Sequence, residues 1–192
     1  MMIETASLVI RELKMDDALP LFEAMECPQV HEMYDNGFTA IDNVRSYIGL
    51  IENEYQQGKH RTLAISERAS GRLIGNITLD VIAVFLRAEL NGYWIDKRWR
   101  GRGYATQAVK AMAAHCFDNL GMNRVQAMTS NPASARVLEK AGMSHEGILR
   151  QYIGMNGVFR DLSMFAILRR DYEPSGKSHG GGATGVSPID SV

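Results

Sequence analysis

Apolar residues recur with helical spacing in two long segments of the chain. In residues 104–120 the apolar side chains stand three or four positions apart, and Gly121 follows the last of them. The segment from Thr39 to Tyr55 shows the same periodicity and is followed by Gly58. This spacing predicts a helix over each segment, and shorter helices over residues 16–25 and 132–142.

Stretches rich in β-branched and aromatic residues lie between these helices. They predict strands over residues 7–13, 61–67, 72–82, 88–96, 123–130, 145–154 and 158–168. The dipeptide Asn156-Gly157 between the last two is a strong hairpin signal. The order of elements predicts a mixed α/β domain in which antiparallel meanders flank one β-α-β crossover. A doubly wound parallel sheet would instead need regular alternation of strands and helices.

Composition favours one globular domain followed by a tail. The chain has 192 residues, of which 45% are hydrophobic and 22% are charged, and this suits a single domain with a full core. Residues 174–192 are rich in Gly and Ser and almost free of large apolar groups. We therefore expect a domain over residues 1–173 and a flexible tail over residues 174–192.

Charge and cysteine content exclude several classes of protein. The net charge of −1 gives no overall basic field that would attract nucleic acid or a membrane. No apolar run approaches the roughly 20 residues needed to span a bilayer. Cys27 and Cys116 form no closely spaced pair, so neither a disulfide framework nor a metal site is expected. The reducing cytoplasm is the expected location.

The segment RWRGRGYAT, residues 98–106, separates a predicted strand from a predicted helix. Gly101 and Gly103 permit tight turns and close approach of the backbone to a ligand. The first amides of the helix lack intrahelical acceptors and carry the positive end of its dipole, which favours phosphate. Three interpretations compete: a solvated basic turn, a dinucleotide-binding loop, or a cradle for the pyrophosphate of coenzyme A. Thr106 stands where a dinucleotide fingerprint has its third glycine, which disfavours the second.

Four blocks of the sequence, taken in order, resemble one family. RWRGRGYA resembles the (Q/R)-x-x-G-x-(G/A) signature of the GNAT acetyltransferase superfamily. ELNGYWIDKRWRGRGYATQAVKAM, NPASARVLEKAGM and GILRQYIGMNGVFRDLSMFAILRRDY resemble blocks of its RimJ/RimL-like branch. The resemblance covers about residues 7–173. It implies the GNAT acyl-CoA N-acyltransferase fold, with a mostly antiparallel sheet, splayed strands and four helices. It also implies direct transfer of an acetyl group from acetyl-coenzyme A to an amine.

The resemblance further implies the residues that hold the co-substrate. Pantetheine would lie between the splayed strands and bond to Asn131, for which turn and helix-cap chemistry is the alternative role. Ser134 would point its hydroxyl at the thiol sulfur, since the chain has no tyrosine in the helix after Asn131. A backbone amide near Tyr93 or Trp94 would stabilise the oxyanion. The expected cofactor-binding set is Tyr93, Trp94, Ile95, Arg98, Arg100, Gly101, Arg102, Gly103, Tyr104, Ala105, Thr106, Asn131 and Ser134.

Glu89 is the expected catalytic base, because it resembles the glutamate of the family's A-E-x-G-Y-W strand. The chain reads A-E-L-N-G-Y-W, with one extra residue after Glu89. Side chains alternate along a strand, so the extra residue reverses the face of Glu89 unless a β-bulge absorbs it. The alternatives are a solvent-facing Glu89, a base role for Asp80, or a water as base.

The acceptor is expected to be an amine-bearing small molecule or a peptide or protein N-terminus. The acidic residues Glu26, Glu32 and Asp35 lie between the first two helices, where a solvated acidic loop is the favoured interpretation and attraction of the positive amine is the alternative hypothesis. Two other functions stay open: a non-catalytic sensor or scaffold that binds acetyl-coenzyme A, and a nucleic-acid binder that uses the arginines. The second lacks interleaved aromatic residues and overall positive charge. Monomer and homodimer are both compatible with the sequence.

Overall fold

A computed structural model describes residues 1–24, 26, 30, 38–57, 60–155 and 157–172. One sheet has the strand order β1-β2-β3-β4-β5-β6-β8-β7, and all neighbouring strands are antiparallel except the parallel pair β5–β6. The strands are β1 (Met2–Glu4), β2 (Leu8–Glu12), β3 (His60–Glu67), β4 (Leu73–Ile82), β5 (Arg87–Ile95), β6 (Arg124–Thr129), β7 (Ser144–Met155) and β8 (Val158–Leu168). The helices are α1 (Ala18–Ala24), α3 (Ile41–Gln57), α4 (Tyr104–Asp118) and α5 (Pro132–Lys140).

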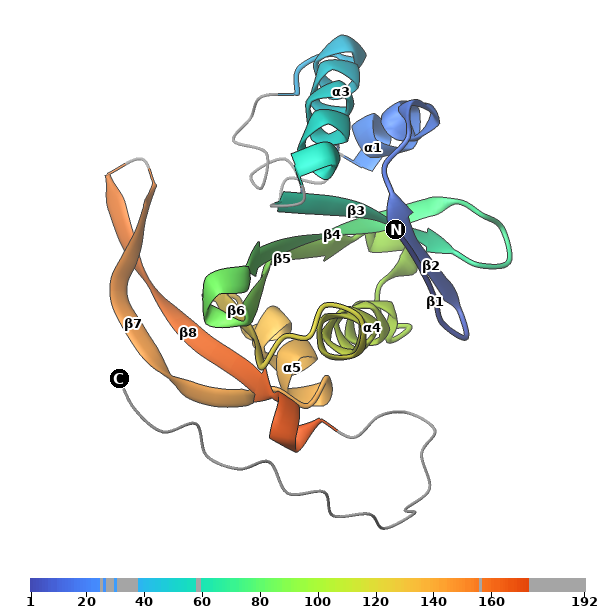
Figure 1. The fold of residues 1–192 in the computed structure, drawn as a ribbon. Coiled ribbons are helices and arrows are strands. Elements are labelled where there is room, and N and C mark those ends of the chain that lie inside the picture. Colours follow the sequence, from blue (N-terminus) through green and yellow to red (C-terminus); the bar gives the residue numbers. More distant parts are fainter. Residues whose placement is uncertain (25, 27–29, 31–37, 58–59, 156, 173–192) are drawn as a thin grey trace, which may run out of the picture.

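The helices cover both faces of the sheet (Figure 1), with α1 and α3 on one face and α4 and α5 on the other. Leu63 and Ile65 of β3 point into the core beneath α4, whereas Ala64 between them packs toward α1 and α3. This alternation places successive residues of each strand in different layers. The chemistry of each strand residue therefore depends on which face it occupies.

The strands β5 and β6 separate after a short ladder. They pair at three positions, from Arg87 opposite Arg124 to Glu89 opposite Gln126. Beyond that point β5 continues to Ile95 and β6 to Thr129 without pairing with each other. The two strand edges therefore face a gap that begins beside Glu89. This is the splay that the family resemblance predicts.

A β-bulge in β5 absorbs the extra residue of the A-E-L-N-G-Y-W segment. The step from Ile77 to Leu79 in β4 lies opposite the longer step from Tyr93 to Leu90 in β5. Gly92, inside this step, has φ of 97°, which a residue with a Cβ rarely adopts. As a result Leu90 and Tyr93 contact the same core although they stand three residues apart. Glu89 accordingly faces away from that core.

The predicted fold class, element order and crossover are confirmed, with one addition. The short strand β1 pairs with β2 at the edge of the sheet and was not predicted, because three residues are too few to show alternation. The β7–β8 hairpin is present, while Asn156 and the predicted tail lie outside the described residues. Among the described helices, none has the length and hydropathy needed to cross a bilayer.

Candidate active site

The arginine-glycine loop ends at the first turn of α4. Gly101 and Gly103 have φ of 77° and 78°, and Gly103 is the N-cap of the helix without a side-chain cap. A Cβ built at either glycine meets no atom within 4 Å, so the space over the loop is open. The Gln107 amide is the first to bond back, to the Gly103 carbonyl. The amides of the preceding turn, residues 104–106, are thus placed as an anion cradle requires.

The three arginines of the loop have different surroundings. Arg98 is paired with Asp96 at 2.5 Å, and this hydrogen bond holds the pKa of the Asp96 carboxyl below its ordinary value. The Nε of Arg100 donates to the carbonyl of Ile95 at 2.8 Å. Both side chains thus fasten the loop to the end of β5. Arg102 is held over the ring of Trp99, with 4.9 Å from its Cζ to the ring centroid. Among the loop arginines, Arg102 is the one best placed to meet an anion.

The splay is bridged by a hydroxyl pair on the α4–α5 face. The Tyr93 hydroxyl lies 2.7 Å from the Ser134 Oγ and donates to the Ser134 carbonyl at 3.2 Å. Burial raises the pKa of the Tyr93 phenol, and the hydrogen bond with Ser134 offsets part of this effect. The phenol is therefore protonated at neutral pH. A tyrosine of β5 thus contacts α5, a helix that contains no tyrosine of its own.

Asn131 and Trp94 occupy structural positions. The Asn131 Oδ1 accepts from the Ala133 amide at 2.8 Å and so caps α5, which leaves its Nδ2 as the group that can bond a ligand. Trp94 is 5% exposed and packs in the core under α1 and α3. The Trp94 side chain is therefore not directed at the arginine-glycine loop. A role of Trp94 in co-substrate binding would have to come from its backbone.

Three polar side chains form a row across the sheet at the start of the splay. Asp80, Glu89 and Gln126 are neighbours in register on β4, β5 and β6. The Gln126 Nε2 donates to the Glu89 Oε2 at 2.8 Å, and the Asn91 Nδ2 donates to the Asp80 Oδ2 at 3.1 Å. Side chains directly opposite each other on adjacent strands have Cβ atoms about 5 Å apart. Two carboxylates therefore stand together where the gap opens.

Glu89 lines a pocket of about 600 Å³ on this face. Apolar side chains of the β7–β8 hairpin line the pocket together with charged and polar groups of β5, β6 and β7. The lining residues are Arg87, Glu89, Arg124, Gln126, Glu146, Gly147, Ile148, Leu149, Tyr152 and Met164. Of the acidic residues expected near the acceptor, Glu26 is an exposed turn residue, and Glu32 and Asp35 lie outside the described residues.

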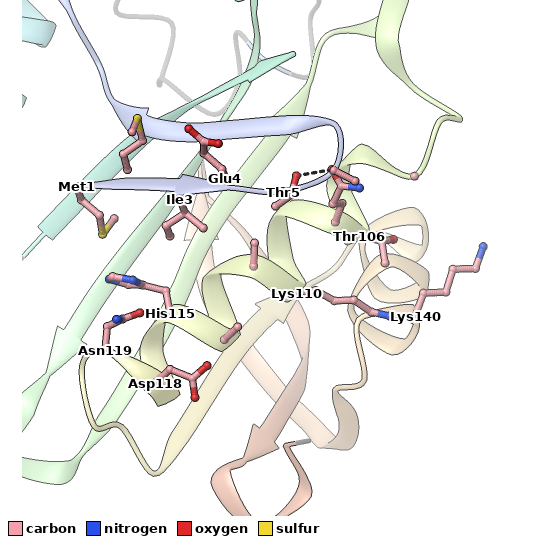
Figure 2. Close-up of a pocket in the computed structure, with 16 residues that line it drawn as sticks. Met1, Ile3, Glu4, Thr5, Thr106, Lys110, His115, Asp118, Asn119 and Lys140 are labelled. Carbon is pink, nitrogen blue, oxygen red and sulfur yellow. Dashed lines mark hydrogen bonds between the residues drawn. The ribbon is translucent and has the colours of Figure 1, made fainter. Parts of the chain in front are cut away.

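A larger pocket, of about 1090 Å³, lies along α4 on the opposite side of the sheet from Glu89. Figure 2 shows it between α4 and the β1–β2 turn, which is tied to the helix by the hydrogen bond from the Thr5 hydroxyl to Gln107, 2.6 Å long. One end of this pocket reaches Gly103 and Thr106 of the arginine-glycine loop. Lys110 and Lys140 line the same pocket and lie on the side of Thr106 in the figure. This pocket adjoins the anion cradle and is remote from the candidate base.

Cys116 is excluded as a nucleophile. Its side chain is fully buried in the core beneath α4, and burial raises the pKa of its thiol to about 12. The thiolate that covalent catalysis requires is therefore absent at neutral pH. Cys116 therefore provides no acetyl-cysteine intermediate, and Cys27 lies outside the described residues.

Comparison with known proteins decides the family. Residues 7–144 match the acetyltransferase (GNAT) domain family. This chain is a GNAT acetyltransferase. The relative named "Probable N-acetyltransferase YjcK", from Bacillus subtilis (strain 168), is 33% identical over 139 residues, 71% of this chain and 77% of the relative. The ribosomal-protein-serine acetyltransferase of Escherichia coli (strain K12) is 29% identical over 96 residues, 49% of this chain and 54% of that protein.

A solved structure titled "Crystal structure of Probable acetyltransferase" has the same fold as this GNAT acetyltransferase. The TM-score is 0.79 at 27% identity, and the likeness covers 90% of this chain and 99% of the other. The predicted GNAT family is confirmed, and relatives named as ribosomal-protein acetyltransferases fit the predicted RimJ/RimL-like branch. The chain is thus an N-acetyltransferase whose acetyl donor is acetyl-coenzyme A.

Sequence reasoning did not find several residues of this GNAT site. Gln126 and Arg124 alternate with the apolar residues of β6, and this alternation was the available signal that they share a face with Glu89. The pairing of Tyr93 with Ser134 joins residues 41 positions apart, so no local pattern indicates it. Arg87 and Glu146 flank Glu89 only because β5, β6 and β7 meet in one pocket.

Proposed function

We propose that this enzyme transfers the acetyl group directly to a primary amine, with Glu89 as the base. The observation that carries the proposal is the position of Glu89 at the point where β5 and β6 separate, on the face opposite the core under α4. An acetyl group that reaches through the gap would meet an amine held beside this carboxylate. Gln126, donating to the Glu89 Oε2, leaves the other carboxylate oxygen for the amine.

The co-substrate is assigned to residues of the loop and the splay. The amides of residues 104–106 and the Arg102 guanidinium would bind the pyrophosphate, and the Asn131 Nδ2 would bind pantetheine. Lys110 and Lys140 are available for the remaining phosphate charge because they adjoin the loop. Arg98 and Arg100 would act by fixing the loop, since Arg98 is paired with Asp96 and the Arg100 Nε donates to the Ile95 carbonyl. Backbone amides on the open edge of β5 are the candidates for the oxyanion.

The Tyr93–Ser134 pair would donate the proton that the departing thiolate needs. We expect Tyr93→Phe to lower kcat about tenfold, because Ser134 remains as a weaker donor, while the KM for acetyl-coenzyme A stays unchanged. Thiol release under saturating amine measures both constants. Tyr93→Phe with Ser134→Ala should lower kcat further. An unchanged kcat in the double variant would remove this pair from the mechanism.

The acceptor is a primary amine, and two sources fit it. A relative bears the name ribosomal-protein-serine acetyltransferase, which supports a protein N-terminus as one source. The pocket beside Glu89, with a volume of about 600 Å³, is large enough for a small molecule as the other.

Calorimetric titration of acetyl-coenzyme A, followed by thiol release against a panel of amines and N-terminal peptides, tests the proposed function. We expect binding, and release that depends on the amine. Binding without release across the whole panel would indicate a protein that binds the acetyl donor without using it. Absence of binding would refute the assignment of the loop.

A further inference from the structure

The pocket beside Glu89 holds an arginine that the proposed mechanism does not use. Arg87 stands two residues before Glu89 on β5, so both side chains lie on the same face of the sheet. Both line the pocket, and their charged groups form no ion pair with each other. The sheet therefore presents a cation and an anion side by side, with the anion nearer to the gap.

The other charges of the pocket are satisfied by one another. Arg124 binds Glu146 through two hydrogen bonds, of 2.9 and 2.5 Å. The Nε of the same Arg124 donates to the Gln126 Oε1 at 2.9 Å, and Gln126 in turn donates to Glu89. This chain of contacts uses both carboxylate oxygens of Glu146 and both polar atoms of the Gln126 amide. The Arg124 charge is therefore neutralised within the protein.

Arg87 is outside this network. Its Nε is buried and has no hydrogen-bond partner among the described residues. Its guanidinium lies 5.8 Å from the centroid of the exposed Phe85 ring, a contact that leaves the planar donors unused. No acceptor among the described residues offsets the charge of this guanidinium, so its terminal nitrogens are the donors available to an anionic ligand. A guanidinium selects carboxylate or phosphate, because its two parallel donors match two oxygens.

The pocket also has apolar lining residues from the β7–β8 hairpin. Ile148 and Tyr152 of β7 line the pocket with 60% and 58% of their surface exposed, and Met164 of β8 lies with them. Exposed apolar groups at a pocket favour an apolar substituent on the ligand. The pocket thus combines an ammonium-binding carboxylate, an unpaired guanidinium and an apolar wall.

We propose that the acceptor of this enzyme is an α-amino acid with an apolar side chain, and that Arg87 binds its carboxylate. The inference rests on the proposed function, since it assumes that Glu89 receives the amine. The ammonium lies at Glu89 beside the gap, the carboxylate lies at Arg87, and the side chain packs against Ile148 and Tyr152. Glu89 takes the proton of the ammonium, the amine nitrogen forms a bond to the acetyl carbon, and the bond from that carbon to sulfur breaks. The thiolate leaves and takes a proton from the Tyr93–Ser134 pair, and the second proton of the acylated nitrogen returns to this pair through water, which gives the N-acetyl amino acid and coenzyme A.

Thiol release from acetyl-coenzyme A with L-phenylalanine and with L-phenylalaninamide tests the proposal. The two probes share the amine and the side chain and differ in the negative charge. We expect kcat/KM to be about tenfold or more higher for the acid, as a charge-assisted pair would give. The amine of L-phenylalaninamide is less basic than that of L-phenylalanine, so a larger fraction of it is neutral at a given pH. A preference for the acid therefore cannot result from the amount of neutral amine. A peptide with N-terminal phenylalanine and an amidated C-terminus serves as the third probe.

Substitution of Arg87 tests whether a preference for L-phenylalanine over its amide depends on this residue. We expect Arg87→Met to lower kcat/KM for L-phenylalanine about tenfold through KM, and to leave the value for the amide within about twofold. Arg87→Lys should retain part of the preference, because it keeps the charge without the paired donors. Arg170→Met is the matched control, since Arg170 is an exposed arginine outside the pocket. Thermal unfolding of each variant checks that it is folded.

The outcomes separate this inference from the proposed function. Equal kcat/KM for acid and amide, a higher value for the peptide, or a parallel loss of both activities in Arg87→Met would overturn the role of Arg87 and leave acetyl transfer intact. Absence of thiol release with all three probes and with the amine panel would overturn both.

Discussion

Gly103→Trp is expected to abolish measurable binding of acetyl-coenzyme A, with a loss of affinity of about 100-fold or more. The phosphate cradle consists of backbone amides, and these can act only if the anion approaches the backbone closely. The space over Gly103 is open, since a Cβ placed there meets nothing within 4 Å. An indole would fill the space that the pyrophosphate needs. Calorimetric titration with acetyl-coenzyme A measures the effect.

Gly71→Trp is the matched control for this prediction. Gly71 lies in the β3–β4 turn, has φ of +69° close to the +78° of Gly103, and likewise has no atom within 4 Å of a built Cβ. Both variants therefore carry similar backbone strain and add the same side chain. We expect the control to bind the co-substrate normally. Equal affinity in Gly103→Trp and the wild-type protein would remove the loop from the site.

Glu89→Gln is expected to lower turnover at neutral pH about 100-fold or more, which is the usual contribution of a positioned base. The glutamine oxygen can still accept from the Gln126 Nε2, so the substitution removes the proton acceptor and preserves the contact across the splay. Affinity for acetyl-coenzyme A should be unchanged, because the carboxylate is not part of the loop. Thiol release at saturating amine gives kcat, and calorimetry gives the affinity.

The pH dependence and a second variant distinguish Glu89 from its alternatives. At high pH the amine is already neutral, so the defect of Glu89→Gln should become smaller as pH rises. Asp80→Asn is the matched control, since Asp80 stands opposite Glu89 in the ladder and is the other candidate base. If Asp80→Asn has the larger defect, the base is Asp80. If both variants are as active as the wild-type protein, a water takes the proton.

The sequence was sufficient for the order of the elements after β1, because periodicity and turn residues are local properties. The position of the arginine-glycine loop before a helix could be predicted for the same reason: Gly101 and Gly103 are adjacent to a helix start in the sequence itself. The face of Glu89 could not be decided in this way. It depends on the bulge at Gly92, and a bulge is defined by the pairing between β4 and β5 rather than by either strand alone.

Long-range contacts account for the other differences. The sequence placed three arginines around the anion, whereas Arg98 and Arg100 are bound to Asp96 and Ile95. It found no tyrosine in the helix after Asn131, whereas Tyr93 reaches that helix from β5. Each contact is set by the tertiary packing of elements that hydrophobic periodicity treats separately. The residue types indicated which binding and catalytic groups the chain contains. The pairing of strands determines where these groups lie.

The short parallel ladder between β5 and β6 has a mechanical consequence. Strands β1–β5 and strands β6–β8 are joined within the sheet only through three paired positions among the described residues. A molecule seated in the gap contacts both parts of the sheet and so acts as a cross-brace between them. Its binding free energy then stabilises the sheet against separation of β5 from β6. A co-substrate bound in the gap, as we propose, would therefore hold the two parts of the sheet together during each turnover.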